Sequence, residues 1–154
     1  MGNGFPVGAV VTTQAISESF ENEMEFFSSF GGNPLATEAA HAVLQILEEE
    51  GLQQCARNTG DYLKSLLAEL QNDFPIIGDI RGEGLFLAIE FTHPDGSPGT
   101  SACKRITNKL KENYILTGSD GRYGETPKIK PPLCFSEENA DRLVEKMANI
   151  LARH

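Results

Sequence analysis

Two long segments of this chain repeat apolar residues at the spacing of an amphipathic helix. In residues 34–50 and 52–72, apolar side chains recur every three or four positions and would form one buried face on each helix. Asn33 followed by Pro34 predicts the start of the first helix, because Asn caps helices well and Pro fits the first helical position. Gly51 predicts its end, since glycine adopts the left-handed conformation that commonly follows a helix.

Shorter patterns predict a small sheet and further helices. Over residues 85–91 large apolar side chains alternate with others, as in a strand with one buried face. The remaining expected elements are a helical turn at 15–20, strands at 76–84 (with a turn or bulge), 114–117 and 128–135, a helix capped by Thr100 or Ser101, and a helix capped by Ser136. Together these elements predict an α+β fold in which helices cover a small antiparallel sheet.

Residues 7–13 do not fit this small domain. They form a short, almost wholly apolar run rich in valine, which predicts a strand buried on both faces. Such a strand needs neighbours on both sides, and no second run of this kind lies in a βαβ unit. We therefore expect an N-terminal strand and loop that belong to another part of a larger fold.

The composition argues against several classes of function. A net charge of −9 disfavours nucleic acid and anionic membrane surfaces as partners. No apolar run approaches the roughly 20 residues that a membrane span needs. The three cysteines, Cys55, Cys103 and Cys134, lack the spacing of a metal site. We expect no disulfide and no metal, buried thiols and a cytoplasmic location.

Four short motifs carry most of the chemical information. They are GNGFP at residues 2–6, SFGGNP at 29–34, RGEGL at 81–85 and KIKPPL at 128–133. Together they resemble the class III (fold type I) aminotransferases, which depend on pyridoxal 5′-phosphate (PLP). The resemblance covers essentially the whole chain, which corresponds to the C-terminal third of such an enzyme. It is strongest to the alanine–glyoxylate aminotransferase 2-like branch, where phospho-lyases of phosphoethanolamine and phosphohydroxylysine are found.

The resemblance implies a domain organisation and a shared cofactor site. Residues 1–32 would be a remnant of the PLP-binding large domain, and residues 33–154 the small domain, entered by the helix at 34–50. Ser29 and Gly31 would bind the PLP phosphate of the other subunit in a homodimer. A hydroxyl beside glycine N–H groups suits phosphate oxygens on physical grounds as well. The alternative is a serine that merely caps a turn.

Lys128 stands where many members of this family carry an arginine that grips the substrate α-carboxylate. Lysine is a point charge and not a planar fork, so the change weakens the case for an ordinary amino-acid transaminase. It fits the phospho-lyase branch and implies that Lys128 binds the substrate, a small amine or amino acid. The alternative is a solvated lysine on an edge strand. Arg81 and Glu83 would serve only their turn, with Arg81 satisfying backbone carbonyls.

The resemblance also implies a chemistry. PLP acts as an electron sink for the carbon next to the substrate nitrogen, and a lysine that binds PLP covalently moves the proton. The family pattern places that lysine about two residues before Met1, so the chain as given would lack it and be inactive alone.

Three hypotheses follow. The first is the C-terminal portion of a transaminase or amine phospho-lyase, cytoplasmic or, in a eukaryote, alternatively mitochondrial. The second is a non-catalytic pseudoenzyme or dimerisation module. The third is an unrelated small enzyme using Asp79, Arg81 and Glu83, which ranks last because nothing supplies a nucleophile or a metal.

Overall fold

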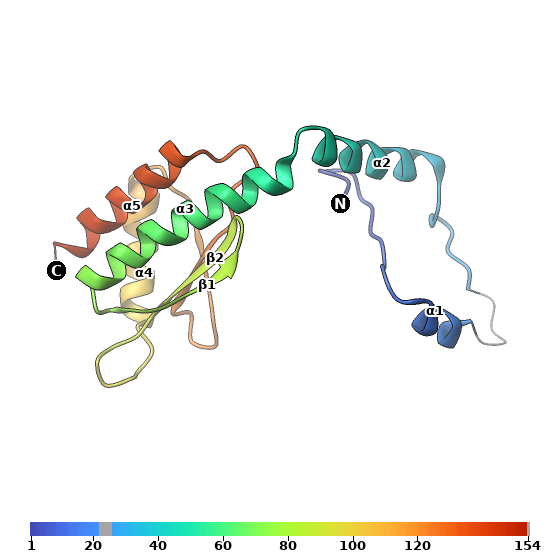
Figure 1. Cartoon of the computed structure of the whole chain (residues 1–154). Helices are drawn as coiled ribbons and strands as arrows, with labels where there is room; N and C mark the ends of the chain where they lie inside the picture. Colours follow the sequence, from blue (N-terminus) through green and yellow to red (C-terminus); the bar gives the residue numbers. More distant parts are fainter. Residues whose placement is uncertain (22–25, 154) are drawn as a thin grey trace. The chain divides into compact units, whose positions relative to one another are not determined.

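The computed structural model describes residues 1–21 and 26–153 and divides the chain into two compact units, Met1–Leu52 and Gln53–His154. The elements in chain order are α1 (Gln14–Phe20), α2 (Pro34–Glu49), α3 (Leu52–Asp73), β1 (Ile77–Glu83), β2 (Phe86–Phe91), α4 (Thr100–Glu112), β3 (Gly118–Asp120), β4 (Thr126–Ile129) and α5 (Glu137–Leu151) (Figure 1). The assignment of residues 1–32 and 33–154 to two different domains stays a prediction.

The second unit contains a four-stranded sheet with the order β1-β2-β4-β3, and every neighbouring pair is antiparallel. Leu87 of β2 lies opposite Ile129 of β4, and Ile80 of β1 lies opposite Ile89 of β2. The pairing of β1 with β2 is irregular between Ile77 and Asp79, which is the bulge that the sequence predicted. The expected α+β fold with a small antiparallel sheet is confirmed.

One apolar core joins the inner face of this sheet to three helices. The sheet contributes the alternate residues Leu87, Ile89 and Phe91, each at most 1% exposed. The helices α3, α4 and α5 contribute the rows predicted by their helical periodicity, namely Leu63, Leu67, Leu70, Ile106, Leu110, Leu143, Met147 and Ile150. Because strand residues alternate between faces, burial of this set leaves Phe86, Ala88 and Glu90 on the opposite, outer face.

The turn between β1 and β2 rests directly on α3. Gly84 in this turn has φ +53, and a Cβ placed on Gly60 of α3 would lie 2.2 Å from the Gly84 carbonyl oxygen. Two glycines therefore let the backbone of a helix and the backbone of a turn touch. Gly82, with φ +125, completes the sharp bend that the RGEGL motif predicted.

Helix ends agree with the sequence where local capping decides them. The side chain of Asn33 accepts a hydrogen bond from Ala36 N at the start of α2, and Ser136 accepts one from Asn139 N at the start of α5. Gly51 has φ +60, as expected for the residue that ends α2.

The predicted caps for α4 were wrong, because Gly99 is the N-cap. Its N–H donates to Phe91 O, and a Cβ at this position would lie 2.8–2.9 Å from Phe91 atoms. Close approach to β2 therefore selects glycine here. The hydroxyl of Thr100 instead donates to Tyr123 O at 2.9 Å.

Two predicted strands of the second unit differ from the structure. Residues 114–117 form no strand, because Tyr114 has φ +61 and Ile115 N still bonds to Leu110 O at the end of α4. The strand β3 follows immediately, at Gly118–Asp120. The last strand covers Thr126–Ile129 and ends before Pro131, because proline cannot donate to a ladder.

The predicted N-terminal strand is not formed either. Residues 7–13 have no strand partner in the structure, and Val10 and Val11 are 90% and 95% exposed. A strand exists only through hydrogen bonds to a neighbour, and none is supplied here. The helical turn expected at 15–20 is confirmed as α1, whereas the part of the expected loop at residues 22–25 lies outside the described residues.

Burial was predicted correctly for one cysteine of three. Cys103 on α4 is fully buried in the core, and this burial raises the pKa of its thiol to about 11. Cys55 and Cys134 are exposed. Cys55 lies on a helix as predicted, but on the exposed face of α3 and not on its buried face. For Cys134 the expected strand had ended before it.

We predict that Gly60→Ala destabilises the second unit by about 1–3 kcal/mol, because the new methyl group overpacks the contact with Gly84. The measurement is the free energy of unfolding in urea. Gly118→Ala is the matched control, since a Cβ at Gly118 meets nothing within 4 Å. Equal stability of the two variants would show that α3 and the turn are free to separate.

Candidate functional site

The outer face of the sheet carries the predicted substrate residue in a defined row. The register places Arg81, Ala88, Lys128 and Gly118 side by side across β1, β2, β4 and β3. Lys128 therefore has an alanine on one side and a glycine on the other. Two such small neighbours leave room above the sheet for its long side chain.

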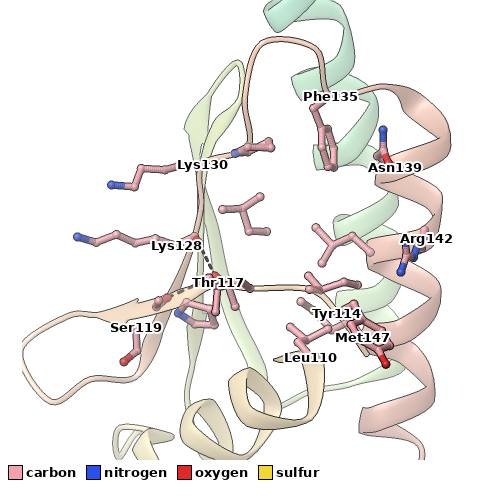
Figure 2. Close-up of a pocket in the computed structure, with 17 residues that line it drawn as sticks. Leu110, Tyr114, Thr117, Ser119, Lys128, Lys130, Phe135, Asn139, Arg142 and Met147 are labelled. Carbon is pink, nitrogen blue, oxygen red and sulfur yellow. Dashed lines mark hydrogen bonds between the residues drawn. The ribbon is translucent and has the colours of Figure 1, made fainter. Parts of the chain in front are cut away.

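Lys128 is anchored through its backbone and paired through its side chain. The hydroxyl of Thr117 donates to Lys128 O at 2.6 Å, which fixes the strand at this point (Figure 2). The ammonium forms an ion pair with Asp120 of β3, and the two side chains are 34% and 54% exposed. The pKa of Asp120 is lowered, chiefly by the hydrogen bond from Lys128. The Asp120 carboxyl is therefore ionised near neutral pH.

A second ammonium group lies on the same side of β4 as the first (Figure 2). Lys130 follows two residues later, and its Nζ lies 5.6 Å from the centre of the Phe86 ring, within cation–π range. Figure 2 shows the side chains of Lys128 and Lys130 extending in the same direction, away from α5. The part of the outer face around Asp120 thus carries the ammonium groups of Lys128 and Lys130 and the ring of Phe86.

A cleft of about 550 Å³ lies on the other side of β4, toward α5. Its wall is mainly apolar, with Leu110, Phe135 and Met147, and it also includes Asn139 and Arg142. In Figure 2 the labelled lysine side chains point away from this wall. Lys128 and Lys130 are also among the residues that line this cleft, while their ammonium groups point away from α5 (Figure 2).

The Arg81 guanidinium forms ion pairs with two carboxylates. The sequence had suggested hydrogen bonds to backbone carbonyls instead. Its Nη1 lies 2.8 Å from Asp79 Oδ2 and 2.6 Å from Glu90 Oε2. These hydrogen bonds, that of Asp79 first, raise the pKa of the guanidinium further above its ordinary value. Glu83 in turn lies 3.8 Å from Arg57. The trio of the third hypothesis is thus engaged in surface ion pairs.

The predicted phosphate-binding turn belongs to the first unit, and Ser28 holds it. Ser28 Oγ accepts a hydrogen bond from Gly31 N at 3.0 Å, and a Cβ on Gly31 would lie 2.9 Å from this side chain. Asn33 closes the next turn by donating from Nδ2 to Phe30 O at 2.7 Å. Ser29 is exposed and is not the residue that caps the turn.

The Gly31 N–H is already used by Ser28 Oγ. Of the predicted pair, the exposed Ser29 hydroxyl is therefore the donor that remains for a phosphate oxygen, and phosphate binding by Ser29 and Gly31 stays a prediction. Ser29 and Gly31 lie in the unit Met1–Leu52, and Lys128 lies in the unit Gln53–His154. Asp120 and Ser28 were missed by the sequence analysis. Serine three residues before glycine was a signal for Ser28, whereas Asp120 is identified only by the register.

Across residues 1–21 and 26–153, no helix combines the length and the apolar character needed to cross a membrane.

Comparison with known proteins gives a consistent result. The sequence profile of the family described as aminotransferase class-III matches residues 1–151. A Drosophila melanogaster protein named alanine–glyoxylate aminotransferase 2-like is 43% identical over 148 residues, which cover 94% of this chain and 30% of the relative. An Arabidopsis thaliana protein named alanine–glyoxylate aminotransferase 2 homolog 2, mitochondrial, is 43% identical over 149 residues, 96% of this chain and 31% of the relative.

Solved structures agree. A phospholyase from Arthrobacter, in complex with phosphoethanolamine, matches with a TM-score of 0.90 and 35% identity over 100% of this chain and 37% of its own. An aminotransferase from Bacillus anthracis matches with a TM-score of 0.78 and 29% identity over 92% of this chain and 34% of its own. The chain spans about 30% of the length of the curated relatives it matches.

Proposed function

Because this chain belongs to the class-III aminotransferase family, we propose that it forms the small domain and part of the cofactor site of a PLP-dependent enzyme acting on small amines. We propose further that the complete protein is an amine phospho-lyase. Such an enzyme converts an amine phosphate such as phosphoethanolamine, with one water, into an aldehyde, ammonia and inorganic phosphate.

The proposal rests mainly on the presence of a lysine at position 128. It stands in the KIKPPL motif, where a family member specific for carboxylates would need the planar fork of arginine. The structure holds Lys128 between two small neighbours, with Lys130 beside it. Two point charges suit a phosphate group, which carries up to two negative charges and three acceptor oxygens. The likeness to the Arthrobacter phospholyase supports the same choice.

The residues of this chain would perform binding and orientation. Ser29, with the backbone near Gly31, would hold the phosphate of PLP, while Lys128 and Lys130 would hold the anionic group of the substrate. PLP, when bound, supplies the electron sink for the chemical step. We propose that the lysine attached to PLP comes from outside residues 1–154.

Transfer of an amino group from alanine to glyoxylate is the second candidate. The names of the Drosophila and Arabidopsis relatives favour it. A non-catalytic module is the third, and assays of the complete protein separate all three. The proposed compartment is the cytosol, with the mitochondrion as the alternative because one relative is named mitochondrial. Cell fractionation distinguishes the two.

We predict that the complete protein, loaded with PLP, releases inorganic phosphate and ammonia from phosphoethanolamine. Lys128→Met should reduce kcat/KM by about 10- to 100-fold, the loss of one hydrogen bond to a charged group. Lys104→Met, on the exposed surface of α4, is the control and should retain full activity. Pyruvate formed from alanine and glyoxylate, without phosphate release, would establish the second candidate, and no turnover of either substrate would establish the third.

A homodimer is the proposed assembly, and apolar side chains of the first unit support it. Five large apolar side chains of this unit are 74–95% exposed, namely those of Val10, Val11, Phe26, Phe27 and Phe30. Exposed apolar side chains in such number are typical of a surface that binds another protein chain. Light scattering should therefore give a mass above the 16.8 kDa of one chain. Replacing Val10 and Val11 by Asp should lower that mass. A single-chain mass for the wild type would refute the assembly.

We predict that Ser29→Ala weakens PLP binding to the complete protein by about 10-fold or more, because a donor to a charged phosphate is lost. Titration followed by the absorbance of bound PLP measures this change. Ser17→Ala, in α1 of the same unit, is the matched control. Unchanged affinity in Ser29→Ala would leave Ser29 without a cofactor role.

A further inference from the structure

Asp120 gives the predicted substrate lysine a counter-ion within its own sheet. We propose that Asp120 is an exchangeable counter-ion: it pairs with Lys128 while the anion site is empty and gives up that ammonium when an oxyanion, phosphate or carboxylate, binds. The inference rests on the proposed function, in which Lys128 holds the anionic group of the substrate. It adds that binding of this group is an exchange of one anion for another.

The strand register creates the pair. Gly118 of β3 lies opposite Lys128 of β4. Asp120, two residues after Gly118, lies opposite Thr126, two residues before Lys128. Residues two apart on a strand share one face, so Asp120 and Lys128 are diagonal neighbours on the outer face. A lysine is long enough to span this diagonal. Gly118, directly opposite Lys128, places no side chain on this face.

The position of Asp120 allows it to leave. It is the last residue of a three-residue strand at the end of the strand order, so β3 pairs with β4 on one side alone. The next residue, Gly121, has φ +89 and starts the turn that leads to β4. The Asp120 side chain is 54% exposed, and exposed ion pairs contribute little net stability. Separating this pair is therefore a small cost for an incoming anion.

Lys130 completes the exchange site. It also helps to hold the pKa of Asp120 below its usual range, as a smaller contribution than that of Lys128. In this cluster two ammonium groups face one carboxylate. After exchange both lysines are available to a phosphate.

The test is anion binding to the 154-residue chain, without PLP. Inorganic phosphate and, separately, acetate are titrated at low ionic strength, and the backbone N–H signals of Gly118 and Ile129 are followed by NMR. Asp120→Asn should lower the Kd for the bound anion about two- to fivefold, as expected for removal of an exposed competing charge. Asp120→Glu should restore the wild-type value. Asp61→Asn, which removes the same charge from the exposed surface of α3, should leave it unchanged.

The outcomes are decisive in both directions. A tighter Kd in Asp120→Asn that disappears when Lys128→Met is added supports the exchange. A gain with phosphate alone, or with acetate alone, supports it and identifies the class of anion. Unchanged or weaker binding in Asp120→Asn overturns it. Because these titrations need no cofactor, their failure leaves the PLP chemistry untouched, and failure of the enzyme assays leaves the exchange measurable.

Discussion

The pairing of β4 between β2 and β3 is the constraint on which the candidate substrate site depends. It places Ile129 in the apolar core and, one residue earlier, Lys128 on the outer face. A slip of one residue would exchange the two faces, bury an ammonium and expose an isoleucine. The cost of burying that charge makes the register strongly specified. The same burial that stabilises the domain therefore also orients the Lys128 side chain, for which we propose a role in ligand binding.

The sequence predicted well those features that neighbours along the chain decide. Asn33 and Ser136 cap their helices through atoms three residues away, so α2 and α5 begin where expected. The apolar rows of α3 and β2 likewise follow from local periodicity. The predicted class of fold and the family motifs rest on these same local signals.

Features decided by distant residues were harder to predict. The strand expected at 114–117 looks apolar, but a strand needs a partner, and only Gly118–Asp120 reaches β4. Gly99 displaced the expected caps of α4 because the backbone of β2 comes too close for any side chain. Asp120 belongs to the site only through a diagonal contact across two strands. Ser28 and Ser29 are adjacent in sequence, and the structure alone shows which of them holds the turn.

The contact of Gly60 with Gly84 has a mechanical consequence. The contact joins the helix α3 to the β1–β2 hairpin through main-chain atoms alone. Substitution of the surrounding side chains therefore leaves the geometry of the contact unchanged. A change in the length of the turn would have a larger effect. An inserted residue would shift β2 relative to α3, and β4 would move together with β2 because the two strands are hydrogen-bonded. A change of chain length near residue 84 would thus be transmitted across the sheet to the ammonium of Lys128, on a strand that the insertion never touches.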